Sequence, residues 1–245
     1  MILLRSVSCQ ILFYGWLAAL LILYLPLLLA PRRWMVKAAR FWVRGALVIL
    51  RVTAGLGHEV RGRENKPAGA FVVAAKHQSM WDTLIFHTLL DDPVYILKKE
   101  LTAIPFFGWY LRQSGMIAVD RKAGAKAMRR MVEDARRAVA EGRQIVIFPE
   151  GTRTAPGSTP SYHPGVAMLY DLGVPLVPVA LNSGLYWGRR SFRRRPGRIV
   201  IEFLPAIPPG LDRRAFLARL SANIEAATGR LVEEAKAGGA GAGCG

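Results

Sequence analysis

Apolar residues follow three patterns along this chain. Residues 11–30 carry no charged side chain at all. From about residue 57, short runs that are rich in β-branched residues and bounded by Gly, Pro or charge predict strands at 70–75, 94–97, 116–119, 144–148, 176–181 and 198–203. Longer stretches with helical spacing predict helices at about 80–90, 123–141, 164–172 and 212–236. Strands that alternate with helices predict an α/β fold with a mixed, largely parallel sheet flanked by helices.

The uncharged run 11–30 predicts a membrane anchor, because about 20 apolar residues in a helix cross a hydrocarbon core of ~30 Å. A signal peptide usually has a shorter apolar region, followed by a small-residue cleavage site. Here Pro31, Arg32 and Arg33 follow the run at once, which favours an uncleaved helix. A helical hairpin that enters one leaflet, bent at Pro26 and Pro31, fits the same residues.

The flanking charges predict the orientation of this anchor. Arg5 precedes the apolar run, and six cations follow it within residues 32–51. The positive-inside rule then places everything after residue 31 on the cytoplasmic face of the cell (inner) membrane. The segment 34–56 mixes cations with apolar residues, which is typical of a helix in the membrane interface. An amphipathic helix packed on the globular part would show the same pattern.

Length and composition indicate how the chain is divided into an anchor, a domain and a tail. The 245 residues suffice for one domain with a substantial core and a short appendage. We expect an anchor and interfacial helix at 1–56, a globular domain at 57–237, and a disordered Gly- and Ala-rich tail at 238–245. Cys9 and Cys244 stand at opposite ends, so the sequence shows no disulfide framework, zinc-ligand spacing or cysteine nucleophile.

The charge balance indicates an anionic partner. Lys and Arg number 34 against 17 Asp and Glu, a formal net charge of +17. Nucleic acid, a membrane surface and a phosphorylated substrate all fit this excess. Six of the arginines crowd into residues 189–198, where a membrane surface, coenzyme phosphates or plain solvation would relieve their repulsion.

The segment that follows the apolar run 70–75 combines a histidine with a carboxylate. His77 stands where that strand ends, which is the usual place for active sites on such sheets, and its imidazole can accept a proton at neutral pH. If the next helix begins near Ser79, His77 lies in the preceding turn and can fold back toward Asp82, which would fix the ring tautomer. Ser79-x-x-Asp82 also resembles a capping box, so Asp82 has a purely structural interpretation.

Three further segments place polar groups or a proline beside predicted strands. Phe148-Pro149-Glu150-Gly151-Thr152-Arg153 should reach the same sheet edge as His77; its glycine permits an unusual turn, and its arginine can grip a phosphate in a bidentate manner. A surface turn with two charges is the alternative. Residues 115–121 end in Asp120-Arg121. In the run 174–181, Pro178 cannot donate to a ladder, so an edge strand or a bulge is implied.

These four segments together resemble the glycerophospholipid acyltransferase family, especially its 1-acylglycerol-3-phosphate acyltransferases. The family carries, in this order, an NHxSxxD block, a G-x-I-x-V-D-R block, an FPEGTR block and a VPxVPV-like block. The resemblance covers roughly residues 57–205, and the N-terminal apolar segment also fits it. His-x4-Asp alone is a weak signal, whereas its combination with FPEGTR about 70 residues later and VDR between them is specific.

The resemblance implies a role for each block. His77 would be the catalytic base and Asp82 its orienting partner. The acceptor's phosphate and glycerol would be bound by Arg121, Glu150, Gly151, Thr152 and Arg153. Support for the site and the acyl chain would come from Val177, Pro178 and Val179. Two positions depart from the family pattern: Lys76 replaces the usual Asn, and a Lys commonly found before a downstream Gly is missing around His163-Pro164-Gly165.

The implied activity is direct transfer of a fatty acyl group from acyl-CoA or acyl-ACP to the sn-2 hydroxyl of 1-acyl-glycerol-3-phosphate, giving phosphatidic acid. Beyond this co-substrate, the resemblance implies no cofactor and no metal. Its partners would be membrane lipids, the lysophospholipid and the acyl donor, with no nucleic acid expected. Two alternatives remain open: an O-acyltransferase for another lysolipid such as lyso-ornithine lipid, and a non-enzymatic membrane-surface adaptor.

Overall fold

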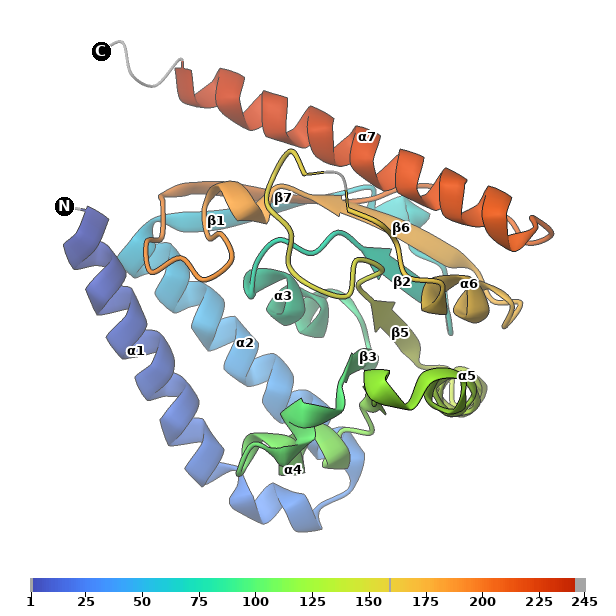
Figure 1. Ribbon diagram of the computed structural model, residues 1–245. Helices are drawn as coiled ribbons and strands as arrows, with labels where there is room; N and C mark the ends of the chain where they lie inside the picture. The colour runs from blue at the N-terminus through green and yellow to red at the C-terminus, as the bar shows by residue number, and fades with distance from the viewer. Residues whose placement is uncertain (1, 159, 241–245) are drawn as a thin grey trace.

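A seven-stranded sheet in the order β1-β7-β6-β2-β5-β3-β4 forms the centre of the protein (Figure 1). The computed structural model describes residues 2–158 and 160–240. Strands β6, β2, β5, β3 and β4 run parallel, while β7 and β1 form a parallel pair that is antiparallel to β6. This confirms the predicted mixed, largely parallel sheet. The strands are β1 (Leu56–Arg61), β2 (Val72–Ala75), β3 (Pro93–Lys98), β4 (Ile117–Val119), β5 (Gln144–Ile147), β6 (Leu176–Leu181) and β7 (Gly197–Phe203).

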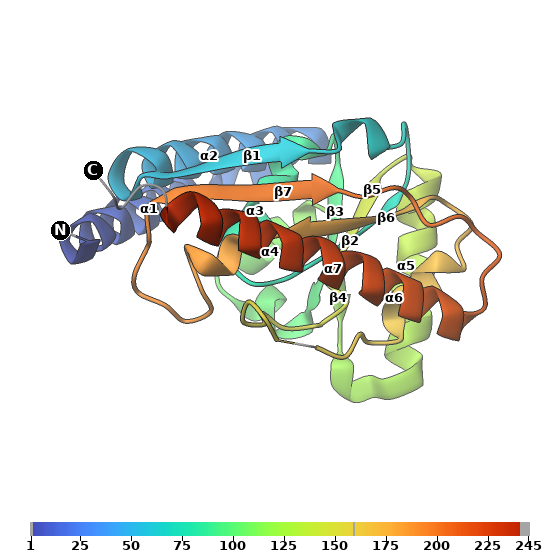
Figure 2. The same cartoon turned by 90° about the horizontal axis from the view of Figure 1, so that it is seen from above.

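Helices cover both faces of the sheet (Figures 1 and 2). On one side lie α1 (Ile2–Leu23), α2 (Arg32–Ala54), α3 (Trp81–Leu89) and α4 (Phe107–Gln113). On the other side lie α5 (Gly124–Ala140), α6 (Gly165–Tyr170) and α7 (Arg213–Ala240). Short 3-10 helices connect these elements: η1 (Leu25–Leu29), η2 (Arg63–Asn65), η3 (Lys99–Ala103), η4 (Arg121–Ala123) and η5 (Ser183–Leu185).

The central strand β2 shows why the layers form on both sides. Val73 and Ala75 belong to the apolar core beneath α2 and α3, whereas Val72 and Ala74 belong to the core beneath α5, α6 and α7. Side chains of a strand alternate between its two faces, so an uninterrupted apolar run is buried only where both faces are covered. All four residues are fully buried, as this requires.

The predicted strands and helices are all present, with ends that shift by up to four residues. Two elements escaped prediction. Strand β1 lacks a β-branched run because Gly57, Glu59 and Arg61 interrupt it, and helix α4 is only seven residues long. Helix α7 continues to Ala240, three residues into the segment expected to be disordered, and residues 241–245 lie outside the described part.

The N-terminal segment forms a helical hairpin rather than one long apolar helix. Helix α1 ends at Leu23 and η1 follows, so the run 11–30 is not a continuous span. Arg5 Nε donates to Thr53 O at 3.2 Å and Trp16 Nε1 donates to Trp42 O at 2.9 Å, which shows that α1 and α2 are antiparallel. A side chain at Gly45 would meet the Trp16 ring at 2.6 Å, so glycine permits the close contact.

Helix α2 is part of the globular core. Val43, Ala46 and Leu50 are fully buried in the core that also holds α3 and the sheet. The interpretation of 34–56 as an amphipathic helix packed on the domain is therefore confirmed. A second stripe on α2 remains exposed: Trp34, Phe41, Val48 and Val52. Because its first three members are seven residues apart, they share one helix face.

The expectation of an edge position for Pro178 is wrong. Strand β6 lies between β7 and β2, and all six of its residues are buried. Proline is tolerated because the ladder to β7 is interrupted there: regular pairing starts at Val179, and an isolated bridge joins Leu176 to Ile207. Leu204 N donates to Pro178 O at 2.9 Å across this irregular stretch. An interrupted ladder requires no N–H from the proline.

We expect Leu50→Ala to lower the free energy of unfolding by about 2–5 kcal/mol, because it leaves a cavity in a closed core. Val52→Ala on the same helix should change it by about 0.5 kcal/mol or less, since Val52 is 73% exposed. Denaturant unfolding in detergent micelles measures both. Equal, small effects would show that α2 does not stabilise the domain.

Candidate active site

His77 lies directly beyond the carboxyl end of β2, in the turn that leads into α3. Its backbone is held on both sides by the 148–154 turn, which follows β5: His77 N donates to Glu150 Oε1 at 3.2 Å, and Thr154 N donates to His77 O at 2.8 Å. The imidazole stacks on the Phe148 ring, with centroids 4.1 Å apart. The predicted meeting of these two segments at one sheet edge is confirmed.

The predicted His77–Asp82 pair is also present. His77 Nδ1 lies 3.0 Å from Asp82 Oδ2, and Asp82 is fully buried. The same oxygen accepts from Gln78 N and Ser79 N at 2.7 Å each, which is the capping role that the sequence left open. Asp82 Oδ1 accepts from Ser183 Oγ at 2.6 Å. Capping and pairing are therefore two functions of one carboxylate.

This arrangement fixes the chemistry of the imidazole. A carboxylate can only accept, so Nδ1 carries the ring proton and Nε2 presents a lone pair. The ring has 13% of its surface exposed, so a second reactant has access to it. An imidazolium formed by proton uptake at Nε2 would be stabilised by the Asp82 charge next to Nδ1–H. The pair is therefore arranged as a general base.

Glu150 is occupied within the protein. Its Oε1 accepts from His77 N and lies 3.2 Å from Lys76 Nζ, and its Oε2 accepts from Thr154 Oγ1 at 2.6 Å. Burial raises the pKa of this carboxyl, while the Lys76 charge and the hydrogen bonds from Thr154 and His77 oppose that rise. Glu150 thus holds the turn against His77, and its contact with an acceptor stays a prediction.

The rest of the turn faces outward. Gly151 has a φ of +65°, a left-handed conformation that suits glycine. Thr152 is exposed and Arg153 is partly exposed. Within the described residues, the Arg153 guanidinium makes no hydrogen bond or ion pair, so it is available to an anion. His163, from the segment that departs from the family pattern, is also exposed, and its N donates to Pro149 O at 2.8 Å.

Of the remaining predicted residues, those on β6 lie next to the strand that leads to His77, whereas Arg121 follows a strand farther along the sheet. Val177, Pro178 and Val179 are on β6, next to β2, and Lys76 N donates to Val179 O at 2.9 Å. They therefore support the segment that carries His77, whereas their contact with an acyl chain stays a prediction. Arg121 follows β4, which β5 and β3 separate from β2, and its side chain lies outside the described part.

Lys76 and Ser183 contribute in ways that the sequence did not reveal. Lys76 is buried, and its Nζ lies 2.8 Å from Glu225 Oε1 on helix α7. Ser183, which bonds Asp82, is 101 residues away along the chain, in the turn after β6. Neither Glu225 nor Ser183 belongs to a periodic pattern or a short motif, so only the folded topology brings these two residues to the site.

The arginine-rich loop extends from this turn to the start of β7. Arg194 is buried, lies 4.1 Å above the Trp187 ring, and donates to Gln10 Oε1 on α1 at 3.0 Å. Arg189 Nη1 donates to Arg153 O at 3.3 Å. Arg194 thus has a structural role, while exposed guanidinium groups remain at Arg189, Arg190, Arg193 and Arg195. The loop joins α1 to the 148–154 turn.

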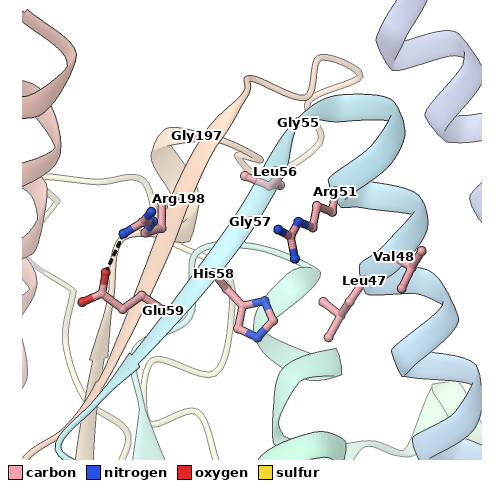
Figure 3. Close-up of a pocket in the computed structure, with 10 residues that line it drawn as sticks. All are labelled: Leu47, Val48, Arg51, Gly55, Leu56, Gly57, His58, Glu59, Gly197 and Arg198. Carbon is pink, nitrogen blue, oxygen red and sulfur yellow. Dashed lines mark hydrogen bonds and ion pairs between the residues drawn. The ribbon is translucent and has the colours of Figure 1, made fainter. Parts of the chain in front are cut away.

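A hollow of about 800 Å³ opens between α2 and the start of β1 (Figure 3). Leu47 and Val48 form an apolar wall, and Arg51 and His58 point into the space. Burial, followed by the charges of Arg63 and Arg51, lowers the pKa of His58. The His58 ring lies 5.8 Å from that of Trp81, the first residue of α3. Glu59 and Arg198, which are bonded to each other, also line the hollow, so its lining carries both signs of charge.

Comparisons with known proteins find similar sequences with acyltransferase names. A family model described as Acyltransferase matches residues 57–182. A 1-acyl-sn-glycerol-3-phosphate acyltransferase from Pseudomonas aeruginosa is 34% identical over 186 residues, covering 76% of this chain and 72% of the relative. The alpha form from Mus musculus is 32% identical over 201 residues, covering 80% and 70%.

A solved structure gives the same fold. The crystal structure of the 1-acyl-sn-glycerophosphate (LPA) acyltransferase from Thermotoga maritima superposes with a TM-score of 0.76 at 21% identity. The match covers 94% of this chain and 99% of that one. The agreement therefore extends over most of the chain and shows a shared fold.

We expect Ser183→Ala to lower the free energy of unfolding by about 1–3 kcal/mol, because it removes a buried donor from a carboxylate. Ser158→Ala is the control, since that exposed hydroxyl bonds only Ala155 O and its loss should cost about 0.5 kcal/mol or less. Denaturant unfolding compares them. Equal effects would show that Ser183 is not needed to hold Asp82.

Proposed function

The chain belongs to the acyltransferase family, and we propose that it moves a fatty acyl group from a thioester to the sn-2 hydroxyl of 1-acyl-sn-glycerol-3-phosphate. The names of its relatives support the enzyme class and the acceptor. The thioester donor and the role of His77 rest on chemistry. The observation that carries the mechanism is the 3.0 Å contact between His77 Nδ1 and the buried Asp82 carboxylate.

His77 Nε2 removes the proton from the acceptor hydroxyl while that oxygen attacks the thioester carbonyl. The resulting tetrahedral intermediate collapses, the carbon–sulfur bond breaks, and the imidazolium returns the proton to the leaving thiolate. Asp82 stabilises the imidazolium between these two steps. A positioned general base contributes about 10²–10⁴ in rate, and further acceleration comes from holding both lipids together.

Cations next to His77 suit the phosphate of the acceptor. Arg153 belongs to the turn whose Glu150 accepts from His77 N, and it lies three residues after Glu150 along the chain. Arg189, bonded to Arg153 O, adds a second guanidinium. Planar guanidinium groups bind phosphate in a bidentate manner. We assign the phosphate to this pair, with the exposed Thr152 hydroxyl as an additional donor.

The membrane holds the protein through the α1–α2 hairpin, which we place in one leaflet on the cytoplasmic face. Helix α1 is the one described helix long and apolar enough to cross a bilayer, and only 22% of its most apolar window is buried in the protein. However, α1 is packed antiparallel on α2, and α2 belongs to the domain core. A spanning α1 would therefore draw the domain into the hydrocarbon. Lying in the leaflet, the hairpin exposes the apolar stripe of α2 to lipid.

Helix α4 extends the apolar surface of the hairpin. Gln113 Nε2 donates to Ala30 O at 2.8 Å, and Tyr110 OH donates to Leu21 O. These bonds attach α4 to the bend between α1 and α2. Phe106 and Trp109, which are 40% and 42% exposed, lie beside that bend. Aromatic side chains are favoured at the level of lipid headgroups.

We expect His77→Ala to reduce transfer by about 10²–10⁴-fold without unfolding the protein, because only the base is lost. The assay follows labelled acyl groups from acyl-CoA and from acyl-ACP to lysophosphatidic acid and to other lysolipids, including lyso-ornithine lipid. His163→Ala is the matched control and should retain activity.

Three results would argue against this proposal. Full activity of His77→Ala would show that His77 is not the general base. If the unmodified protein prefers a lysolipid without a phosphomonoester, the proposed acceptor is wrong, although the proposed mechanism can stand. An inactive protein that binds anionic vesicles in a salt-sensitive manner would favour the adaptor interpretation.

The hairpin predicts that both ends of the chain lie on the same side of the membrane. Tags placed at the N-terminus and at the C-terminus should both be cleaved by protease added to inside-out vesicles, and neither in sealed right-side-out vesicles. The C-terminal tag serves as the internal control for sidedness. Cleavage of the two tags from opposite sides would show that α1 spans the bilayer.

A further inference from the structure

One buried cation lies directly before the catalytic histidine, and two carboxylates surround it. Lys76 Nζ lies 2.8 Å and 2.9 Å from the two Glu225 oxygens and 3.2 Å from Glu150 Oε1. The Lys76 side chain is 1% exposed, and that of Glu225 is 28% exposed. Tyr162 OH donates to Glu225 Oε1 at 2.8 Å. The cluster thus combines β2, the 148–154 turn and helix α7.

The mechanism described above makes no use of Lys76 or Glu225. Lys76 Nζ is turned away from the reacting atoms toward α7, and its three contacts match the three donors of an ammonium group. Glu225 is 149 residues away in sequence, at the middle of α7. Burying a lysine is costly unless it is paired, and Glu225 and Glu150 supply that pairing.

We propose that Lys76 and Glu225 are positioning residues that hold Glu150, and through it the backbone of His77, in the geometry required for proton transfer. This inference rests on the proposed function. The contact sequence is continuous: Glu225 holds Lys76, Lys76 holds Glu150 Oε1, and that oxygen accepts from His77 N. Replacing Glu225 or Lys76 therefore loosens the imidazole, although neither residue contacts the ring.

The electrostatics support the same interpretation. Burial raises the pKa of Glu150, and the charge of Lys76 is the largest influence that opposes the rise. Without Lys76, Glu150 would take up a proton at a higher pH than in the unmodified protein. A protonated Glu150 is a poorer acceptor for His77 N. The positioning of His77 would therefore fail first at acid pH, and kcat would fall there first. Ordinary loss of stability has no reason to produce this shift.

Replacement of Lys76 by methionine keeps the length of the side chain and removes its charge. We expect Lys76→Met to lower kcat by about 10–100-fold, since small displacements of a reacting group have effects of this size. The KM for the lysolipid should change by less than about twofold, because the phosphate contacts stay intact. The acid limb of the kcat profile should move to higher pH.

Glu225→Gln removes one holder of Lys76 but leaves the Lys76 charge beside Glu150, so it should lower kcat to a smaller degree without moving the acid limb to higher pH. The double variant should be no slower than Lys76→Met alone, because both changes break one sequence of contacts. If Lys76→Met does not fold, Glu225→Gln alone decides, through its kcat. An unchanged kcat and pH profile in every variant that folds would overturn the proposal.

A matched control separates positioning from simple anchoring of α7. Arg230 on α7 bonds both Glu202 oxygens on β7, at 2.9 Å and 2.8 Å, and so ties the same helix to the sheet away from His77. Arg230→Met should reduce thermal stability and leave kcat and its pH dependence unchanged. If it reproduces the acid-limb shift, Lys76 and Glu225 act only by anchoring the helix, and the proposal fails.

A readout without turnover keeps this test independent of the acceptor. The rate of diethyl pyrocarbonate modification at His77, measured by peptide mass spectrometry across pH, reports the environment of the imidazole directly. Its pH profile should move in Lys76→Met and not in Arg230→Met. An unmoved profile would refute positioning even if the enzyme proved to use another acceptor, whereas absence of turnover in the unmodified protein would refute only the proposed function.

Discussion

The need to satisfy one buried carboxylate organises the active site. Asp82 is fully buried, and its two oxygens interact with three donors and the His77 ring. A buried charge without such partners would destabilise the fold by several kcal/mol. The turn after β2, the start of α3 and the turn after β6 are therefore fixed relative to one another. Catalytic geometry follows from a requirement of folding.

The same requirement explains why charged residues gather at this edge of the sheet. Lys76 and Glu150 are as deeply buried as Asp82, and each compensates the other. In parallel strands the carboxyl ends of β2, β5 and β6 meet at one edge, so side chains that follow them can satisfy each other across the strands. The apolar strands exclude water beneath the site, which strengthens each of these interactions.

The sequence predicted the parts of this arrangement that depend on local pattern. Periodicity predicted the central strands, and the turn expected before the helix, together with the family resemblance, predicted the His77–Asp82 pair that the fold brings to 3.0 Å. It could not identify Ser183 or Glu225, which reach the site across 101 and 149 residues. For Pro178 the local rule named an edge strand or a bulge, and the fold places the residue in a central strand whose ladder to β7 is interrupted; the edge was wrong because strand order depends on contacts distant in sequence.

The loop after β6 connects the chemistry to the membrane-facing helix. Ser183, at its start, bonds Asp82, and Arg194, further along, bonds Gln10 while its N–H donates to Ser6 Oγ on α1. Because Arg194 is buried and stacked on Trp187, this attachment is stiff. Asp82 and helix α1 thus share one connection through this loop, so in the proposed one-leaflet placement the depth of α1 would set the height of His77 relative to the lipid. Under the proposed function, an acceptor whose hydroxyl lies just outside the hydrocarbon would then reach the imidazole without leaving the membrane.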